Sequence, residues 1–423
     1  MTTGSLRFSV VVAIALLAAP LATAVAQQDA ANIGAKLLTE AAVTAAVEMI
    51  RAAEPQTIEN QIRLCEVAAP PFKEAKRAEV YARMFREAGL QNVRIDKEGN
   101  VLGDRPGVQP RPRLVFTAHL DTVFPEGTDV RVKRDGAILR GPGIGDDCRG
   151  LAVLLAVVNA MNQANVQTQG SITFVGTVGE EGLGDLRGVK YLFNDGMKGQ
   201  IDRFVSIDGT GLGITHIAVG SLRYRVTFKG PGGHSYGAFG LSNPMHALGR
   251  AVATISQFEV PLDPKTTFNV GRIGGGTSVN AIPFDAWMEV DMRSASPSAL
   301  EALDAKFKRA VDEAVRDEDA RWKKNVLSVE KALVGQRPAG QTPANSPIVQ
   351  AAVSVTRALG FPVALDEGST DSNIAMSLGI PAITIDGGGR GTGSHALDEA
   401  FDPANSWMGS QRALLLAIAL ARQ

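Results

Sequence analysis

Two adjacent glutamates, Glu180 and Glu181, stand at the end of an apolar run in the segment TVGEEGLGD. Two carboxylates at 4 Å repel each other by ~4 kcal/mol at an effective dielectric of 20, so a buried pair needs compensating positive charge. Charged residues are also common in loops between a strand and a helix, and a solvated loop would explain the pair as well. The other motifs of the chain decide between these readings.

A histidine and an aspartate end another apolar run, LVFTAHLDTV. His119 and Asp121 are two residues apart, so they lie on one face of an extended chain. A metal-bound imidazole needs its second ring nitrogen held, often by a carboxylate, and Asp121 has the right reach. Alone, the pair would also fit a surface histidine beside an acid.

A glycine-rich segment, RGPGIGDDCRG, lies between a predicted strand and a long apolar helix. Its glycines allow a tight backbone approach that places Asp146 at a strand end. Asp147 can act at the N-terminus of the helix as its cap. We therefore expect Asp146 to belong to the site.

Two further motifs complete the set. Asp208 follows the strand in VSIDG, and His395 stands in the late glycine-rich segment GTGSHALDEAFD. Gathering Asp146, Glu181 and Asp208 with two neutral imidazoles puts three negative charges in one cleft, which is prohibitive without cations. Two divalent ions and one bridging hydroxide balance this charge, and imidazole and carboxylate ligands suit zinc. The sequence therefore predicts a two-metal hydrolytic site.

Strands that alternate with helices must position these residues. The strand-like runs are NVRID, RLVFTA, SITFVGTV, RGVKYLF and RFVSID, and the helical runs include EAKRAEVYARMFREAGL and GLAVLLAVVNAMNQA. This alternation predicts an α/β sheet covered by helices on both faces, with the chemistry in loops at the strand ends. The same character returns after RPAGQTPANSP, with a helix around IVQAAVSVTRALG, the strand PAITI and a last helix up to the C-terminus.

The pattern changes near Gly213. From there the order is strand, helix, two strands, helix and strand, which is typical of the split unit of a small α+β sandwich. We therefore predict a catalytic domain in two parts, 27–212 and 334–423, with a second domain inserted at 213–333.

The first segment has the features of a cleavable signal peptide. Arg7 precedes a short apolar run broken by Pro20, and an A-V-A stretch ends at Ala26. This pattern predicts cleavage after Ala26 and a periplasmic or secreted mature chain without 1–26. An uncleaved membrane anchor is the alternative, disfavoured because the run is short for a span, and no later stretch is long and apolar enough to cross a bilayer.

The charge of the chain indicates the class of its partner, and its two cysteines raise the question of a disulfide. The chain has 43 basic and 44 acidic residues and so lacks the basic excess of nucleic-acid-binding proteins, which favours a small-molecule partner. Export would permit a disulfide between Cys65 and Cys148, but sequence cannot show their proximity. A buried free thiol is the favoured state for each.

Taken in order, the motifs resemble those of the M20 family of metallopeptidases and amidohydrolases. That group includes glutamate carboxypeptidases, tripeptide aminopeptidases, succinyl-diaminopimelate desuccinylases and acetylornithine deacetylases. The resemblance covers nearly the whole mature chain, and the insertion is similar to the family's ferredoxin-like lid or dimerisation domain. It implies two zinc ions per subunit, with cobalt or manganese as alternatives, and a homodimer formed through the lid.

The resemblance also implies a role for each residue of the set. Asp146 would bridge both metals. One metal would add His119 and Asp208, and the other would add Glu181 and His395.

Three further roles follow from the resemblance. Asp121 would orient His119, and Glu180 would be the general base that takes the proton of the bridging water. His234, in KGPGGHSYG, matches the lid histidine that in these enzymes reaches across a dimer to the oxyanion of the tetrahedral intermediate. A loop histidine of no function is the alternative for His234.

Substrate contacts are implied at two places. GGGTSVNAIP and EVDMRS match lid positions that hold a substrate carboxylate, which nominates Asn280 and Arg293, and arginine suits forked carboxylate recognition. EGSTDSN resembles the catalytic-domain loop near the substrate, and its expected contacts are Gly368, Ser369 and Thr370.

Some residues depart from the family pattern or match no motif. Many members have lysine after the paired aspartates, whereas Cys148 and Arg149 stand here. The ligand set is complete without Cys148, so we favour a supporting or disulfide role for it. His216 and His246 match no motif and are predicted to be structural.

The resemblance is strongest to the tripeptide aminopeptidase and glutamate carboxypeptidase branches, so we predict a peptidase that cleaves small peptides. Zinc would lower the pKa of bound water toward ~7, and Glu180 would take its proton and deliver it to the leaving amine. The alternative is an N-acyl amino acid amidohydrolase or deacetylase with the same metals. From another class, a periplasmic binding protein that has lost catalysis would have no need of Glu180.

Overall fold

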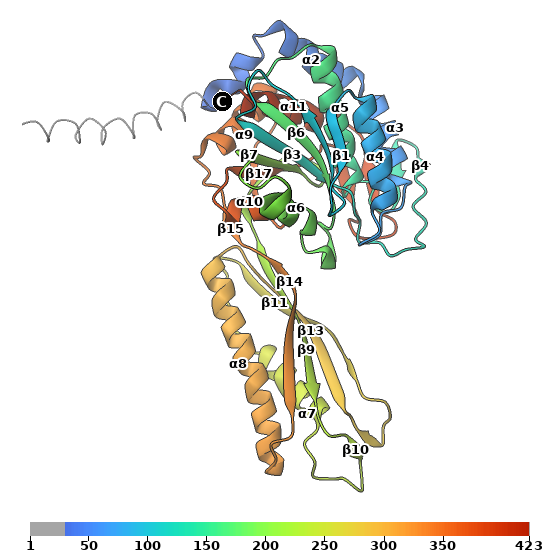
Figure 1. Ribbon diagram of the computed structural model, residues 1–423, viewed down its shortest axis with the longest axis vertical. Helices are drawn as coiled ribbons and strands as arrows, with labels where there is room; N and C mark the ends of the chain where they lie inside the picture. Colours follow the sequence, from blue (N-terminus) through green and yellow to red (C-terminus); the bar gives the residue numbers. More distant parts are fainter. Residues whose placement is uncertain (1–29, 423) are drawn as a thin grey trace, which may run out of the picture. The chain divides into compact units, whose positions relative to one another are not determined.

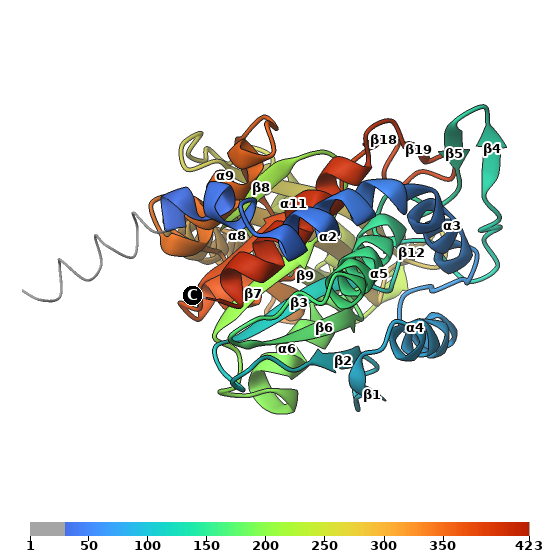
Figure 2. The same cartoon turned by 90° about the horizontal axis from the view of Figure 1, so that it is seen from above.

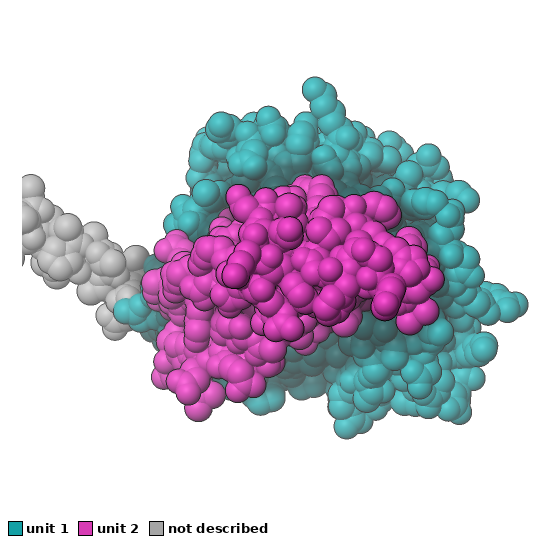
Figure 3. Space-filling model, turned by 90° about the horizontal axis from the view of Figure 1, so that it is seen from below, with its two compact units in different colours: residues 1–216, 342–366, 370–423 teal, residues 217–341, 367–369 magenta. Residues whose placement is uncertain are grey.

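The computed structural model describes residues 30–422 (Figure 1), so the predicted signal peptide lies outside the described residues. The chain divides into two compact units, coloured separately in Figure 3. Among the described residues, unit 1 comprises 30–216, 342–366 and 370–422, and unit 2 comprises 217–341 and 367–369. Each unit is built around a sheet of its own.

A nine-stranded mixed sheet forms the centre of unit 1. Across the sheet the strands are β1 (Gln91–Ile95), β2 (Val101–Arg105), β6 (Ser171–Thr177), β3 (Arg113–His119), β7 (Arg203–Ile207), β17 (Ala382–Ile385), β8 (Gly213–Ala218) and β15 (Gly340–Gln341), with β16 (Ala364–Gly368) paired to β8. The four central strands, β6, β3, β7 and β17, are parallel, and they are almost wholly buried. Burial on both faces explains why these runs are continuously apolar rather than alternating.

Helices cover this sheet, as the sequence predicted. They are α2 (Ala41–Ala52), α3 (Glu54–Cys65), α4 (Ala75–Glu87), α5 (Cys148–Gln163), α6 (Arg187–Tyr191), α9 (Pro347–Ala358), α10 (Ser372–Ser377) and α11 (Trp407–Leu420). Figure 2 shows the sheet between a layer that contains α2, α5 and α11 and the short helix α6. Among residues 30–422, no helix combines the length and the apolar character that a membrane crossing requires.

One predicted strand, RGVKYLF, is wrong. Residues 187–191 form α6, and the helical turns continue to Gly196. The reason lies in the strand order: β6 and β7 are parallel and β3 lies between them, so the chain must cross over β3. Such a parallel crossover usually contains a helix.

A second, four-stranded sheet in unit 1 joins two distant segments. Its order is β18 (Arg390–Thr392), β19 (Ala400–Asp402), β5 (Ile138–Arg140) and β4 (Lys133–Asp135). Ala400 lies opposite Arg140, and Phe401 lies opposite Leu139. This register brings the loop before β19 next to the loop after β5, and these loops carry His395 and Asp146.

Unit 2 has the predicted ferredoxin-like order of elements. They are β9 (Gly220–Lys229), α7 (Pro244–Ile255), β11 (Thr266–Gly275), β13 (Asp285–Ser294), α8 (Pro297–Trp322) and β14 (Ser328–Arg337). The sheet order is β11-β13-β9-β14, and α7 and α8 bury their apolar faces against it. Asn243 and Ser296 cap the two helices. A short pair of strands, β10 (Gly233–His234) and β12 (Ala281–Ile282), extends from this core.

The observed division differs from the predicted boundaries of 213 and 333. At the first boundary, β8 pairs with β17 and so belongs to the large sheet, and unit 2 begins at Ile217. At the second, β14 continues to Arg337, opposite Ser221 of β9, and unit 2 extends to Gln341. Strand pairing therefore moves both ends of the insertion toward the C-terminus.

Candidate metal centre and active site

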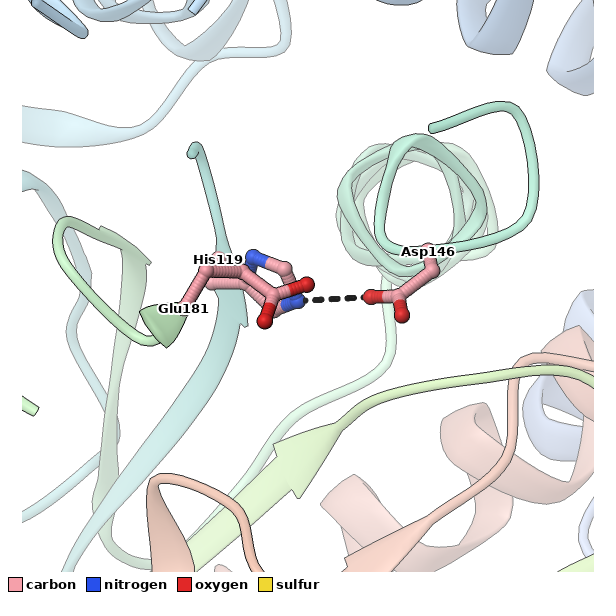
Figure 4. A group of neighbouring side chains, drawn as sticks. All are labelled: His119, Asp146 and Glu181. Atoms are coloured by element: carbon pink, nitrogen blue, oxygen red, sulfur yellow. Dashed lines mark hydrogen bonds and ion pairs between the residues drawn. The ribbon is translucent and has the colours of Figure 1, made fainter. Parts of the chain in front are cut away.

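His119, the last residue of β3, lies at the centre of the site (Figure 4). It is buried, and its Nε2 atom lies 3.0 Å from Oδ1 of Asp146. Its Nδ1 atom lies 3.0 Å from the main-chain oxygen of Asp121. A carbonyl oxygen can only accept, so Nδ1 carries a proton and Nε2 presents its lone pair to the Asp146 carboxylate unless a second proton or a metal ion lies between them.

The carboxylate of Asp121 holds the two glutamates rather than His119. Its Oδ1 and Oδ2 atoms accept the main-chain N–H groups of Glu180, at 3.0 Å, and Glu181, at 2.8 Å. Its distance to His119 Nδ1 is 3.7 Å, which is longer than a hydrogen bond. Asp121 therefore orients His119 through its main-chain carbonyl, and its carboxylate fixes the glutamate loop.

Asp146 lies in a loop rather than at the strand end that the sequence predicted. Strand β5 ends at Arg140, because its pairing with β19 covers only Leu139 and Arg140. The Asp146–Asp147 peptide bond is cis. Asp147 caps α5 as predicted, accepting from Gly150 N at 3.0 Å, and it also accepts from the main-chain N–H of His119 at 3.0 Å.

His395 and Ser394 reach Asp146 from the loop between β18 and β19. The Nε2 atom of His395 lies 3.0 Å from Oε1 of Glu181 and 3.3 Å from Oδ2 of Asp146. The hydroxyl of Ser394 donates to the same Oδ2 atom at 2.9 Å. The loop between β18 and β19 thus contacts Asp146 and Glu181, which the sequence predicted to share a site with His395.

Asp208 follows β7, and its Oδ1 atom lies 4.0 Å from His119 Nε2. The structure contains two groups of possible ligand atoms, and within each group the atoms lie within 4.8 Å of one another. One group is His119, Asp146 and Glu181, and the other is His119, Glu180 and Asp208. Unit 1 therefore brings together the five predicted metal ligands and Glu180. The division of roles between Glu180 and Glu181 stays a prediction.

Titration reflects this crowding of acids and imidazoles. Burial disfavours a charge on His119, yet the carboxylates of Asp121 and Asp146 raise its pKa well above the ordinary value. Asp146 and Glu181 raise the pKa of His395 to about 10. Burial raises the pKa of Asp208 well above the ordinary value. Neighbouring carboxylates thus raise the pKa of both imidazoles, and burial raises the pKa of Asp208.

The donor set fits metal ions. Two ligands that lie 2.0–2.1 Å from one tetrahedral zinc ion are about 3.3 Å apart. The distances from His119 to Asp146, from His395 to Glu181 and from His395 to Asp146 are 3.0, 3.0 and 3.3 Å. Imidazole nitrogens and carboxylate oxygens are ligands that zinc accepts, and the hydrogen bond from His119 Nδ1 orients its ring.

The sequence did not reveal the role of Glu399. Its buried carboxylate accepts main-chain N–H groups from Gly143 and Gly145, both at 2.8 Å, and from Asp146 at 3.1 Å. Burial raises its pKa to about 7, and the three amides oppose that shift. The only local signal is its place four residues after His395 in SHALDE.

Arg149, which follows Cys148, is fully buried in α5. It donates to Glu54 Oε1 at 2.8 Å, to the main-chain oxygens of Gly387 at 2.7 Å and Ser406 at 2.6 Å, and to Ser410 Oγ at 3.1 Å. Its guanidinium therefore ties α5 to α3, α11 and the Gly387 loop.

Cys65 and Cys148 are both buried and are not bridged, in line with the favoured reading. The thiol of Cys65 donates to the main-chain oxygen of Pro142 at 3.4 Å. A hydrogen bond with Cys148 and burial raise the pKa of Cys65 well above its ordinary value. The two thiols thus belong to a small buried cluster with Leu139, Ile144 and Phe401, and this cluster includes part of the loop that carries Asp146.

Within unit 2, His234 and Asn280 lie near each other. Strand β10 places His234 opposite Ala281, and the main-chain oxygen of Asn280 accepts from Ser235 N at 2.9 Å. The Nδ1 atom of His234 accepts the N–H groups of Tyr236 and Gly237, both at 3.2 Å, so the proton of the neutral ring is on Nε2.

Arg293 does not lie near Asn280. Its Nε atom donates to Asp291 Oδ2 at 2.8 Å, and it stands eight positions after Asp285 on β13. At 3.2–3.4 Å per residue, that spacing is about 26 Å, and Asn280 lies beyond the Asp285 end of the strand. Within one chain the two residues are therefore too far apart to hold one substrate carboxylate together, and the role of each in substrate binding stays a prediction.

The three residues predicted to contact substrate in EGSTDSN already have partners within the protein. The main-chain oxygen of Gly368 accepts from Val219 N at 2.7 Å, and Ser369 Oγ accepts from Arg337 at 3.3 Å, both within unit 2. Thr370 belongs to unit 1, where its buried hydroxyl lies 2.7 Å from Thr384 Oγ1.

The two histidines predicted to be structural have partners away from the ligand set. His216 Nδ1 lies 2.9 Å from the main-chain oxygen of Thr342, and His246 Nδ1 lies 3.4 Å from Glu318 Oε1. Neither histidine belongs to a group of ligand atoms found among the described residues.

Comparison with known proteins gives matches at the level of sequence and of fold. The profile of Peptidase family M20/M25/M40 matches residues 115–419. Among relatives, the uncharacterized protein YqjE of Bacillus subtilis is 26% identical over 351 residues, 78% of this chain and 90% of that protein. A succinyl-diaminopimelate desuccinylase of Bordetella avium is 27% identical over 265 residues, 58% and 69% of the two chains. Carboxypeptidase G2 of a Pseudomonas species is 27% identical over 322 residues, 71% and 74%.

Solved structures show the same fold. A tripeptidase from Staphylococcus aureus superposes with a TM-score of 0.71 at 21% identity, covering 88% of this chain and 99% of that chain. The YXEP protein of Bacillus subtilis, described as a dinuclear metal binding peptidase, gives 0.65 at 18% identity, covering 87% and 98%. The predicted α/β fold with an inserted domain is thus confirmed.

Proposed function

Since this chain belongs to peptidase family M20/M25/M40, we propose that it is a two-metal hydrolase that cleaves amide bonds in small peptides. The observation that carries the proposal is the meeting of His119, Asp146, Glu181, Asp208 and His395 in unit 1, with Glu180 beside them. The likeness to the YXEP protein, which is described as a dinuclear metal binding peptidase, supports two metals.

The chain's own residues would divide the work as follows. His119 and Asp208 would hold one ion and Glu181 and His395 the other, with Asp146 shared between them. When bound, the two ions would lower the pKa of a bound water and polarise the substrate carbonyl. Glu180, buried in the loop after β6, would accept a proton from the attacking water and return it to the leaving amine.

We propose that His234 acts as a hydrogen-bond donor during the reaction. Because its Nδ1 atom accepts two main-chain N–H groups, its Nε2–H is directed away from them and is available to a substrate oxygen. A donor of this kind stabilises the negative charge that develops on the carbonyl oxygen. As the sequence implied, His234 would serve the active site of a second copy, in a homodimer formed through unit 2.

The test is a matched pair of substitutions in adjacent residues, Glu180→Gln and Glu181→Gln. Each removes one negative charge and little volume. We expect Glu180→Gln to retain two metals per chain while kcat for tripeptides falls on the order of 10²–10⁴-fold, the usual contribution of general acid–base catalysis. Glu181→Gln should lose close to one metal per chain, measured by elemental analysis.

Two results would overturn the proposal. Near-normal kcat in Glu180→Gln would remove the general base. A purified protein that neither contains metal nor binds added zinc would favour the non-catalytic periplasmic binding protein instead.

An N-acyl amino acid amidohydrolase is the second candidate, favoured by the likeness to the desuccinylase of Bordetella avium. The metal ligands would serve both reactions, so the substrates must separate them. We propose to compare di- and tripeptides with acetylated and succinylated amino acids on the zinc-loaded protein. Release of free amino acids from peptides alone would support the peptidase, and turnover of acylated amino acids alone would support the alternative.

The cellular setting is also a proposal. The segment up to Ala26 supports export to the periplasm or medium. A separate proposal is that zinc is the native metal, with cobalt and manganese as alternatives. The N-terminal sequence of the secreted protein and its metal content on isolation test these points. A chain that starts at Met1 in the membrane fraction would contradict cleavage.

A further inference from the structure

Glu399 connects the two loops that bring ligands together from opposite ends of the sequence. It directly precedes β19, and Gly141 directly follows β5, the strand that pairs with β19. At this junction Gly141 N donates to the main-chain oxygen of Glu399 at 2.9 Å. The main chains of the two loops are thus in register between the paired strands and the proposed metal ligands Asp146 and His395.

The side chain of Glu399 then enters the Asp146 loop. Its Oε2 atom accepts from Gly143 N at 2.8 Å, and its Oε1 atom accepts from Gly145 N at 2.8 Å and from Asp146 N at 3.1 Å. Successive main-chain N–H groups that converge in this way form an anion-binding nest. Here the anion is a side chain of the protein itself, and it is almost completely buried.

The local sequence suits this contact. A side chain at Gly145 would place its Cβ atom 3.1 Å from Glu399 Oε1 and 3.1 Å from Thr210 Cγ2, and both contacts are tighter than ordinary ones. Glycine at this position therefore lets the carboxylate approach the main chain closely.

One short segment, 394–399, therefore holds both the main-chain N–H and the carboxylate of Asp146. Glu399 holds its main-chain N–H, Ser394 donates to its Oδ2 atom at 2.9 Å, and His395 lies 3.3 Å from that same oxygen. Since Asp146 is the proposed shared ligand, the position of its main chain sets its distance to both histidines.

We propose that Glu399 is a positioning residue for the metal centre: it anchors the Asp146 loop to the His395 loop and so sets the affinity for metal. The proposal rests on the proposed function, because it assumes that these loops bind metal. The carboxylate of Glu399 acts through the backbone of Gly143–Asp146.

The test measures zinc affinity by competition with a chromophoric chelator, without substrate. Glu399→Gln keeps the length of the side chain but directs an N–H₂ group at main-chain donors, so it cannot satisfy all three. Substitution of residues that support metal ligands typically costs 10–100-fold in affinity. We expect a loss of about that size, with kcat recovering when excess zinc is added.

Asp398→Asn is the matched control. It removes the same charge from the neighbouring position, which is exposed, and it should leave zinc affinity unchanged. Gly145→Ala provides a second route if Glu399→Gln does not fold, because the added methyl group presses on Glu399 Oε1 and should weaken zinc binding in a folded protein. Circular dichroism of the metal-free variants confirms folding.

The outcomes separate this inference from the proposed function. A folded Glu399→Gln or Gly145→Ala protein with the zinc affinity of the wild type would overturn the positioning role and leave the proposed function intact. An equal loss in Asp398→Asn would reduce the effect to net charge and would also overturn it. A wild-type protein that binds no zinc would overturn both.

Discussion

The candidate residues of unit 1 and those of unit 2 are held in different ways. In unit 1, the buried carboxylates of Asp121, Asp147 and Glu399 accept main-chain N–H groups from other loops or strands. In unit 2, His234 is exposed, and its ring is held by N–H groups two and three residues away. The unit 1 carboxylates are thus held by long-range bonds, whereas the imidazole ring of His234 is held by local ones.

This difference indicates which region is a preformed site. A buried carboxylate is costly unless hydrogen bonds compensate it, so three such groups around one cluster imply a fixed geometry. Groups held within a fixed geometry can bind a metal ion without reorganisation. The ring of His234 is exposed and held by its own loop, so we expect its contribution to come when substrate or another chain is present.

Removal of metal should have the largest effect, and it should be confined to unit 1. An ion at 1,000 times its dissociation constant stabilises the folded state by about 4 kcal/mol. We expect chelation to abolish activity and to accelerate hydrogen exchange in peptides from β3, β7 and the loop of residues 141–147. Exchange in β9 and β13 should not change. Equal acceleration in both units would break the comparison, and added zinc should reverse the effect.

Substitution of His234 should come next. Loss of one hydrogen-bond donor to a developing oxyanion typically lowers kcat on the order of 10²–10³-fold. We expect His234→Ala to show this loss with normal metal content and normal stability, since the side chain is exposed. His246→Ala, a change to the other histidine of unit 2 that matches no motif, is the control. A fall in metal content in His234→Ala would contradict the assignment of His234 to catalysis.

The sequence could predict that these candidate ligands lie near one another because four of the five, all but Asp146, follow a recognisable element or stand in a glycine-rich turn. His119 and Asp208 directly end or follow buried parallel strands, and glycine-rich turns flank Glu181 and His395. The carboxyl ends of parallel strands meet at one edge of a sheet, so their order already suggests proximity. The same reasoning predicted the ferredoxin-like order in unit 2.

The supporting residues could not be predicted in the same way. Glu399 binds main-chain groups more than 250 positions earlier in the chain, and a main-chain N–H leaves no trace in the residue types. The register between β5 and β19, two strands of three residues each, is too short to detect from alternation. Main-chain contacts also explain the difference at Asp121. The sequence suggested that its carboxylate orients His119, whereas in the structure its main-chain oxygen lies 3.0 Å from His119 Nδ1.

Two aspartates test whether long-range bonds to the main chain matter more for zinc affinity and activity than side-chain ion pairs do. Asp121 accepts two main-chain N–H groups, whereas Asp291 of unit 2 accepts from the side chains of Arg223 and Arg293. Asp121→Asn replaces one acceptor by a donor, so we expect zinc affinity or activity to fall about 10–100-fold. Asp291→Asn should leave both unchanged. Similar losses in the two variants would remove the distinction between the units.

The smallest effects are expected from the two candidate substrate contacts of unit 2. Arg293 forms a half-exposed ion pair with Asp291, and such pairs contribute about 0–1 kcal/mol to stability. Asn280 lies beside the His234 strand, whereas Arg293 stands about 26 Å along β13 from Asp285. If unit 2 acts through its His234 end, Asn280→Ala should raise KM for a peptide substrate and Arg293→Ala should not.

Stability and kinetics together decide between these residues. We expect Arg293→Ala to change the free energy of unfolding by less than about 1 kcal/mol, because its partner Asp291 keeps the hydrogen bond from Arg223 at 3.0 Å. Urea unfolding and KM are measured on both variants, with Arg272→Ala, another exposed arginine of the same sheet, as the control for charge. A rise in KM for Arg293→Ala alone would place the substrate carboxylate at the Arg293 end of β13. One substrate molecule could then not contact both Arg293 and His234 of the same chain.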